Sequence, residues 1–229
     1  ALSPCKGLLR GCDKDPCRVT TPNLFFAKRY VIAHSFCAIM PAMNKPKQPR
    51  PTKADLVAAY GRYVPDLIAP DLRVLFCGIN PSLYSAVVGH HFARPGNRFW
   101  PTLYAAGFTD RQLAPTEERE LLAQGYGITN LVARATATAD ELNADELVTG
   151  YQLLLDKIQT YRPQALAVLG VSAYRTAFAH PKAVVGQQPK PIGQALLWVL
   201  PNPSGLNAHY QLADLARVFG EFRLAIEGE

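Results

Sequence analysis

Two Asn-Pro-Ser turns, each directly after an apolar run, are the parts of this sequence best suited to chemistry. The first, Asn80 to Ser82, follows a run that ends at Gly78, and the second, Asn202 to Ser204, follows a run over residues 195–200. An Asn amide both donates and accepts hydrogen bonds, and small residues let backbone N–H groups approach a ligand closely. Ligands bind at the carboxyl ends of strands in an open α/β sheet, so both turns are expected to face one crevice.

Asn80 has two interpretations. An Asn before Pro commonly ends a strand through a local turn. Alternatively, its side-chain carbonyl orients a water molecule while neighbouring backbone N–H groups hold a ligand. The surrounding residues favour the second interpretation, because a loop with two histidines, an aromatic residue and two arginines follows over residues 89–98.

The aromatic residue of that loop is Phe92, between His91 and Ala93. A loop Phe usually packs beneath its own loop, but an aromatic ring at a strand-end crevice also suits stacking on a nucleic-acid base. Asn97 and Arg98 are expected to cap the helix that follows them.

The second turn continues to Asn207, and its simplest interpretation is a β–α loop. Its small residues, Ser204 and Gly205, also suit backbone contact with a phosphate, and Leu206 has the character of a wedge between base pairs. Ser204 and His209 suggest a serine hydrolase instead, although the sequence has no G-x-S-x-G motif.

Two further polar residues follow the second predicted strand. The amide of Asn130 suits the O4/N3 edge of a pyrimidine, and a turn-forming role explains this residue equally well. Asp140 is the only carboxylate in an Ala/Thr-rich stretch after that strand. Capping of a helix N-terminus is its favoured role, while stabilisation of a reacting sugar is the functional alternative.

The elements that must position these residues alternate between strand and helix. In chain order, we expect helix 52–63, strand 72–78, loop 79–96, helix 97–106, helix 116–125, strand 126–132, loop 133–139, helix 141–161, strand 165–170, helix 172–179, strand 195–200 and helix 209–226. Continuous apolar strands that alternate with helices predict an α/β fold of three layers, with a mainly parallel central sheet flanked by helices.

Charged residues are distributed unevenly along the chain. Residues 1–53 hold ten Lys and Arg against two Asp, whereas residues 54–229 hold fourteen against sixteen acidic residues. We therefore expect a basic, Pro-containing extension over 1–51 and one catalytic domain over 52–229, with Met40 or Met43 as the native start.

Four of the five cysteines lie in the extension without paired spacing, so free thiols in a reducing cytoplasm are expected rather than a metal site. No apolar run reaches the length of a membrane span.

Several of these motifs together resemble the mismatch-specific uracil-DNA glycosylases. The matching segments are Gly78-Ile-Asn-Pro81, Ser85-Ala86, Gly89-His-His-Phe-Ala93, Pro95, Asn97-Arg-Phe-Trp100 and Asn202-Pro-Ser-Gly-Leu206. The resemblance runs from about Leu72 through the final helix. It implies a uracil-DNA-glycosylase-like fold and removal of uracil, or thymine, mispaired with guanine in double-stranded DNA.

The resemblance also implies roles for single residues. Asn80 matches the residue that positions water, Phe92 the residue that stacks on the base, and Leu206 the wedge. Residues expected around the base pocket are Gly78, Ile79, Ser82, Ser85 and Asn130, and those expected to contact DNA are Asn202, Ser204, Gly205 and Asn207. Ser82 stands where the family pattern usually has Gly, and its added bulk bears on pocket width. We expect a monomeric, monofunctional DNA glycosylase that needs no cofactor or metal ion. It is expected in the cytoplasm, associated with the nucleoid and not with a membrane. The alternative is a non-catalytic module that binds mismatched DNA.

Overall fold

The computed structural model describes residues 50–228, and the predicted extension lies outside the described residues apart from its last two positions. Its elements are α1 (Lys53–Val57), β1 (Val74–Gly78), α2 (Leu83–Val88), α3 (Phe99–Ala105), η1 (Pro115–Glu117), α4 (Glu120–Ala123), β2 (Tyr126–Asn130), η2 (Ala139–Glu141), α5 (Ala144–Tyr161), β3 (Ala165–Leu169), α6 (Val171–Ala177), β4 (Gly186–Gln187), β5 (Leu196–Leu200) and α7 (Leu212–Glu227). Within this part of the chain, no helix has the length and apolar character needed to cross a membrane.

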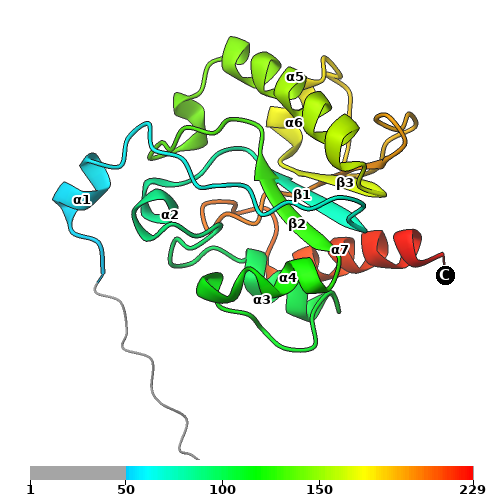
Figure 1. The fold of residues 1–229 in the computed structure, drawn as a ribbon, viewed down its shortest axis with the longest axis horizontal. Helices are drawn as coiled ribbons and strands as arrows, with labels where there is room; N and C mark the ends of the chain where they lie inside the picture. Colours follow the sequence, from blue (N-terminus) through cyan, green and yellow to red (C-terminus); the bar gives the residue numbers. More distant parts are fainter. Residues whose placement is uncertain (1–49, 229) are drawn as a thin grey trace, which may run out of the picture. The chain divides into compact units, whose positions relative to one another are not determined.

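The centre of the fold is a five-stranded sheet in the order β2-β1-β3-β5-β4. The first four strands pair in parallel, and the short β4 is antiparallel to β5. Helices α5 and α6 cover one face of the sheet, while α3 and α7 cover the other (Figure 1). The predicted three-layer α/β fold with a mainly parallel sheet is confirmed.

Alternate residues of the buried strands supply the two cores. Phe76 packs with Phe99, Phe219 and Phe222 on the α3/α7 side. Leu75 belongs to the core on the α5/α6 side. This alternation follows from the two-residue period of a strand, and it explains why the strands are apolar throughout.

The prediction of a loop over 79–96 was wrong, because α2 lies within it. The Ser82 side chain caps the first turn by accepting from the Ser85 N–H at 3.1 Å. Gly89 ends the helix in the left-handed region, at φ 74°. The helix has only six residues, and its boundaries carry the ordinary signals of a Ser cap and a terminal Gly.

Other element boundaries also differ from expectation. The helix predicted over 52–63 is shorter in the structure, where α1 ends at Val57 and turns follow the helix. The expected Thr52–Asp55 capping box is present. The predicted helix 116–125 is divided into η1 and α4, because the Glu117 carboxylate accepts from the Ala114 N–H and so closes a separate first turn. The long helix α5 begins at an Asn143–Glu146 capping box instead of at residue 141. Strand β4 was not predicted.

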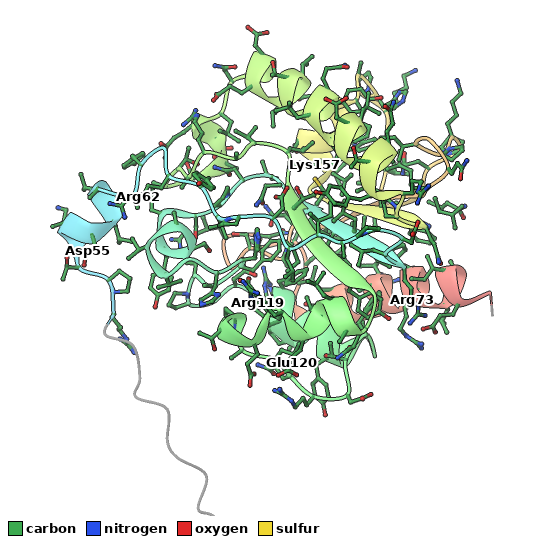
Figure 2. The ribbon with its side chains drawn as sticks, in the orientation of Figure 1. Asp55, Arg62, Arg73, Arg119, Glu120 and Lys157 are labelled. Atoms are coloured by element: carbon green, nitrogen blue, oxygen red, sulfur yellow. The ribbon has the colours of Figure 1, made fainter. Side chains whose placement is uncertain are left out.

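An ion pair joins α5 to the loop before the sheet. Lys157 on α5 lies between the helix and β2 (Figure 2), with its Nζ 2.6 Å from Asp66 Oδ2 and 2.9 Å from Thr129 Oγ1. Thr129 in turn donates to Asp66 Oδ1. Cys77 in the adjacent strand is a free, fully buried thiol, and burial raises its pKa to about 12. A thiol with so high a pKa stays protonated and is unreactive.

Candidate active site

A small cavity of about 100 Å³ lies where the carboxyl ends of the parallel strands meet. Gly78, Asn130 and Leu169, the last residues of β1, β2 and β3, line it, as do Asn202 and Ser204 from the turn after β5. The two Asn-Pro-Ser turns therefore face one crevice. Strand order reverses at β1, whose sequential successors lie on either side of it, and such a switch point is the usual ligand site of an open α/β sheet.

The side chain of Asn80 lines this cavity in a fixed orientation. Its Nδ2 donates to the carbonyl of Arg134 at 3.0 Å and to Thr136 Oγ1 at 2.7 Å. A carbonyl oxygen can only accept, so these contacts identify which end of the amide carries the hydrogens. Both N–H groups are used, and Oδ1 has no hydrogen-bond partner among residues 50–228.

The loop after β2 holds Asn80 in place. The Thr136 hydroxyl donates to the carbonyl of Thr138 at 2.7 Å, so the same oxygen can accept the hydrogen bond from Asn80. The Leu83 N–H donates to the Thr136 carbonyl, and the Thr136 N–H donates to that of Pro81. These bonds extend the β1–β2 pairing beyond the strands, which positions the first Asn-Pro-Ser turn.

An ion pair anchors the same loop to α5. Arg134 forms a two-point contact with the carboxylate of Glu146 and donates to the Glu141 carbonyl at 3.0 Å. Glu146 also accepts from the Asn143 N–H at the start of the helix. The Arg134 hydrogen bond, followed by that from Asn143, lowers the pKa of Glu146 to about 2, so this carboxylate is ionised at any physiological pH.

Asn130 supplies an unpaired amide to the cavity. The residue is only 8% exposed, yet its side-chain oxygen and nitrogen have no hydrogen-bond partner within the described chain. Gly78 permits this arrangement, because a Cβ at position 78 would lie 2.5 Å from Asn130 Oδ1 and 3.2 Å from Phe92 Cζ. The Asn130 amide is open to the cavity, so it can pair with a ligand there without first breaking a bond within the protein.

Phe92 lines the cavity and also packs on the core. Its ring stacks on Phe99 with the ring centres 4.0 Å apart. Its φ of 53° lies in the left-handed region, which non-glycine residues seldom adopt. The two interpretations of Phe92 are thus compatible, since packing on Phe99 holds a strained residue at the edge of the cavity.

The loop that carries Phe92 is bound to buried polar groups. The Ser85 hydroxyl accepts from the Ala93 N–H at 3.1 Å and also contacts the Ser82 hydroxyl. Glu118 accepts from the His91 N–H at 2.8 Å, and His91 Nε2 donates to the carbonyl of Pro65. Burial lowers the pKa of His91, so this ring is neutral and serves to hold the loop.

Arg98 positions the second turn, a function that the sequence did not reveal. Its guanidinium donates to the carbonyls of Ser204, Asn207 and Tyr210 at 2.5–2.7 Å, and its own N–H donates to the Pro203 carbonyl at 2.9 Å. The N-cap position of α3 is Arg98, whose side chain does not cap the helix, while Asn97 just before it accepts from the Phe99 N–H through Oδ1. Arg98, by contrast, binds a segment about one hundred residues away in the chain.

The second turn is also braced internally, and Leu206 projects from it. Asn202 Oδ1 accepts from the Ser204 N–H, Ser204 Oγ accepts from the Leu206 N–H, and Asn207 Nδ2 donates to the Asn202 carbonyl. Leu206 itself is 66% exposed and borders the cavity. Gly205 lies so close to Gly96 that a Cβ would be 2.6 Å from the Gly96 carbonyl oxygen.

Most of the predicted site residues share this cavity. Its lining includes Gly78, Ile79, Asn80, Ser82, Ser85, Phe92, Asn130, Asn202, Ser204 and Leu206. Gly205 and Asn207 lie in the same turn but outside the lining. Asp140 lies in η2, is exposed and does not line the cavity, although Ala139 beside it does. Ser204 Oγ and His209 share no hydrogen bond in the structure.

Sequence reasoning missed Thr136 as well as Arg98, because their roles are set by contacts with distant segments. A Thr in an Ala/Thr-rich loop gives only the signal of a hydroxyl after a strand. Among residues 50–228, no group of three or more His, Cys, Asp or Glu side chains is placed to hold a metal ion.

Comparison with known proteins relates the chain to one family. Residues 65–223, more than two-thirds of the chain, match the family model described as the uracil DNA glycosylase superfamily. A solution NMR structure of a protein from Methanosarcina acetivorans, proposed to be a uracil DNA glycosylase, is 18% identical. The alignment covers 71% of this chain and 98% of that one, with a TM-score of 0.48.

Proposed function

The chain belongs to the uracil DNA glycosylase superfamily, whose members are DNA glycosylases, and we propose that it excises uracil mispaired with guanine from double-stranded DNA. The reaction is hydrolysis of the bond between the base and C1′ of its deoxyribose, which leaves an abasic site. Within the superfamily, we assign the chain to the mismatch-specific group.

The observation that carries this proposal is the amide of Asn130, which has no partner among the described residues and opens to the cavity beside the ring of Phe92. The Oδ1 and Nδ2 atoms of Asn130 complement the N3–H and O4 of uracil, one accepting and the other donating. A flat ring held against Phe92 gains stacking energy that does not depend on sequence. The cavity is small, which suits a single pyrimidine rather than a larger ligand.

Asn80 then orients the attacking water. The glycosidic bond breaks with much oxocarbenium character, so the sugar needs a positioned nucleophile more than a strong one. The Oδ1 atom of Asn80 is free to accept from water, because both N–H groups of that amide are occupied. An amide cannot remove a proton, so slow turnover is expected. Backbone N–H groups of the turn after β1 stabilise the charge that develops on the departing base.

Base flipping supplies the nucleotide to the cavity, and Leu206 fills the space it leaves. Flipping costs a few kcal/mol of stacking and pairing, least for a mispaired base, and an inserted apolar side chain offsets part of that cost. We assign Gly205 and Asn207 to the guanine left without a partner, and Asn202 and Ser204 to positioning of the strand. The exposed Arg94 at the cavity edge suits contact with a phosphate.

The hydroxyl of Ser82 also affects which bases fit. It is held by Ser85, to which it is bonded through both the backbone N–H and the Oγ, so the side chain cannot easily turn away from the cavity wall. We therefore propose uracil as the preferred base, with thymine and other pyrimidines that carry a group at C5 excised less well.

The test is a duplex with a single U:G pair, labelled on the uracil strand, incubated with the protein and then treated with alkali. Alkali cleaves the strand at an abasic site, so a product at the uracil position supports the proposal, provided that Asn80→Ala lacks it. A duplex with a C:G pair at that position controls for nuclease contamination. Binding without cleavage would support the non-catalytic module, and absence of both would leave neither interpretation standing.

A further inference from the structure

A second and larger cavity, about 620 Å³ in volume, shares no lining residue with the first. Helices α5 and α6 form one side of it, and the segment over 180–192, which leads from α6 to β5, forms the other. In Figure 1 this segment continues from α6 as the yellow-to-orange chain beside α5 and α6. The volume falls in the range of sites that bind small organic molecules.

Aromatic rings make one wall of this second cavity. Tyr174 and Phe178 stack with their ring centres 4.3 Å apart, and Tyr151 lies 4.5 Å from Phe178 at a tilt of 52°. Pro181, Pro189 and Pro191 add apolar surface to the lining. A wall of this kind takes a flat, heteroaromatic ring by stacking and apolar contact.

The hydroxyl of Tyr174 is a polar group without an internal partner. The residue is only 1% exposed and lines the cavity, yet its hydroxyl makes no hydrogen bond to any of residues 50–228. The hydroxyl therefore opens to the cavity, where it can donate to an atom of a bound molecule without breaking a bond within the described chain. Burial and then the neighbouring Tyr151 raise the pKa of Tyr174, which keeps the hydroxyl protonated and able to donate.

The charge of the lining is positive. Lys182 and Lys190 both line the cavity with exposed side chains, and none of the lining residues is an Asp or a Glu. The remainder of the domain is, in contrast, slightly acidic, since residues 54–229 carry two more acidic than basic residues. Two ammonium groups match the charge of about −1.5 to −2 on a phosphate monoester at neutral pH.

Hydrogen bonds fix the walls in advance of any ligand. Arg175 Nε donates to the Ala183 carbonyl at 2.9 Å, and Gln188 Nε2 donates to the carbonyls of Val184 and Gly186 at 3.0 Å. Ile192 and Ala195 exchange backbone hydrogen bonds where the segment returns to β5. A cavity built in this way loses little conformational entropy when it is filled.

We propose that this cavity is a second ligand site, which binds a nucleotide with its base against the aromatic wall and its phosphate at Lys182 and Lys190. The Tyr174 hydroxyl donates to an acceptor atom of the bound molecule. This inference does not depend on the proposed glycosylase activity, since no residue of the first cavity takes part in it.

The probe for the test is adenosine 5′-monophosphate, titrated into the full chain by isothermal calorimetry. Adenosine, which lacks the phosphate, and ribose 5-phosphate, which lacks the ring, are the matched ligands. We expect adenosine monophosphate to bind with a Kd below ~1 mM and each fragment to bind at least about tenfold more weakly, because each lacks one of the two contacts. Equal binding of adenosine and its monophosphate, or no saturable binding of the monophosphate, would overturn the proposal.

Variants then locate the binding. Tyr174→Phe keeps the ring and removes the hydroxyl, and it should weaken binding roughly two- to tenfold. The double change Lys182→Gln with Lys190→Gln should weaken it by about tenfold or more, and it keeps the test decisive should Tyr174→Phe fold poorly. Tyr104→Phe on α3 and Lys53→Gln on α1, which remove the same groups elsewhere, should have no effect.

Asn80→Ala distinguishes the two cavities. It should leave binding of adenosine monophosphate unchanged, and loss of binding in this variant would place the nucleotide in the first cavity and overturn the proposal. A 5′-phosphorylated oligodeoxyadenylate is the competitor that identifies the source of the ligand. If this strand competes with adenosine monophosphate, the ligand of the second cavity is the phosphorylated end of a DNA strand. If it does not compete, the ligand is a free nucleotide.

Discussion

At the scale of single residues, Asn80 is the group on which the proposed hydrolysis depends. Its amide is fixed by Arg134 and Thr136, its oxygen has no partner among residues 50–228, and the residue lines the cavity. We expect Asn80→Ala to lower single-turnover excision of uracil from a U:G duplex by roughly a hundredfold or more, the cost of losing a preorganised polar group at a reacting centre. Binding of the duplex, measured by fluorescence anisotropy, should change by no more than about threefold, since a water-positioning residue contributes little to affinity.

The comparison variant for Asn80→Ala is Asp140→Asn. Asp140 remains a proposed supplement to Asn80 for stabilising the cationic sugar, but it is exposed and lies beyond the cavity lining. Solvent and salt screen such a charge, so its removal should lower excision by only about a few-fold. Undiminished excision by Asn80→Ala, or a larger loss with Asp140→Asn than with Asn80→Ala, would contradict this assignment of roles.

Thr136 should act through Asn80. Thr136→Val keeps the shape of the side chain but removes the oxygen that accepts from Asn80 Nδ2 at 2.7 Å. The change also removes the bond that Thr136 donates to the Thr138 carbonyl, but only the bond from Asn80 orients the amide. The loss of that bond is worth about 1 kcal/mol, so excision should fall roughly five- to tenfold while duplex affinity stays constant. Thr136→Ser, which retains the hydroxyl, should restore most of the rate, and failure of this rescue would indicate a packing role for the methyl group instead.

At the scale of elements, the turn over 202–210 is a rigid loop that presents one apolar side chain. Arg98 holds its backbone through three carbonyls, and Leu206 projects from it. Leu206→Ala should therefore reduce excision from a duplex far more than from a single strand, in which the base is already unstacked. Parallel single-turnover assays on the two substrates measure the difference, and an equal loss on both would make Leu206 a packing residue.

The loop after β2 depends on its ion pair with α5. The pKa of Glu146 is held near 2 in the folded protein, against an ordinary value of 4.5. A lowered pKa contributes stability that is fully present above the ordinary value and is lost as pH falls towards the lowered one. The difference in free energy of unfolding between the protein and Glu146→Gln should thus be constant above about pH 5.5 and shrink as pH falls from 4.5 towards 2.

Urea denaturation at pH 7 and pH 3 measures that difference. Glu221→Gln, which removes an exposed carboxylate paired with Arg217 on α7, serves as the matched control and should show a smaller effect at pH 7. A difference for Glu146→Gln that does not change between the two pH values would show that the charge of Glu146 does not anchor the loop.

At the scale of the whole molecule, positive charge and the proposed site are separated along the chain. Residues 1–51 contain nine Lys and Arg against two Asp, whereas every proposed site residue lies beyond Leu72. Removal of residues 1–51 should weaken non-specific DNA binding and flatten its dependence on salt, because fewer phosphate counterions are released. Excision at saturating enzyme should persist, and a folded but inactive truncated protein would show that the extension belongs to the active site.

The sequence by itself predicted the four parallel strands in chain order. It also predicted most of the residues that line the first cavity. Apolar runs predicted β1, β2, β3 and β5, because strands buried on both faces must be apolar throughout. The Asn-Pro-Ser turns directly follow β1 and β5, and parallel strands bring such turns to one edge of the sheet. Several helix boundaries differ from those that the sequence predicts, and α2, with its Ser82 cap and terminal Gly89, lies within a predicted loop.

Only the tertiary structure revealed what holds these groups in place. The bonds from Asn80 to Arg134 and Thr136 join residues more than fifty positions apart, and those from Arg98 to the second turn span more than one hundred. Neither has a local pattern, because each depends on how two loops meet after the sheet has formed. The same holds for the unpaired Asn130 amide over Gly78 and for the Tyr174 hydroxyl in the second cavity. A sequence shows which polar groups a chain carries, whereas burial and the positions of distant neighbours decide which of them remain without a partner.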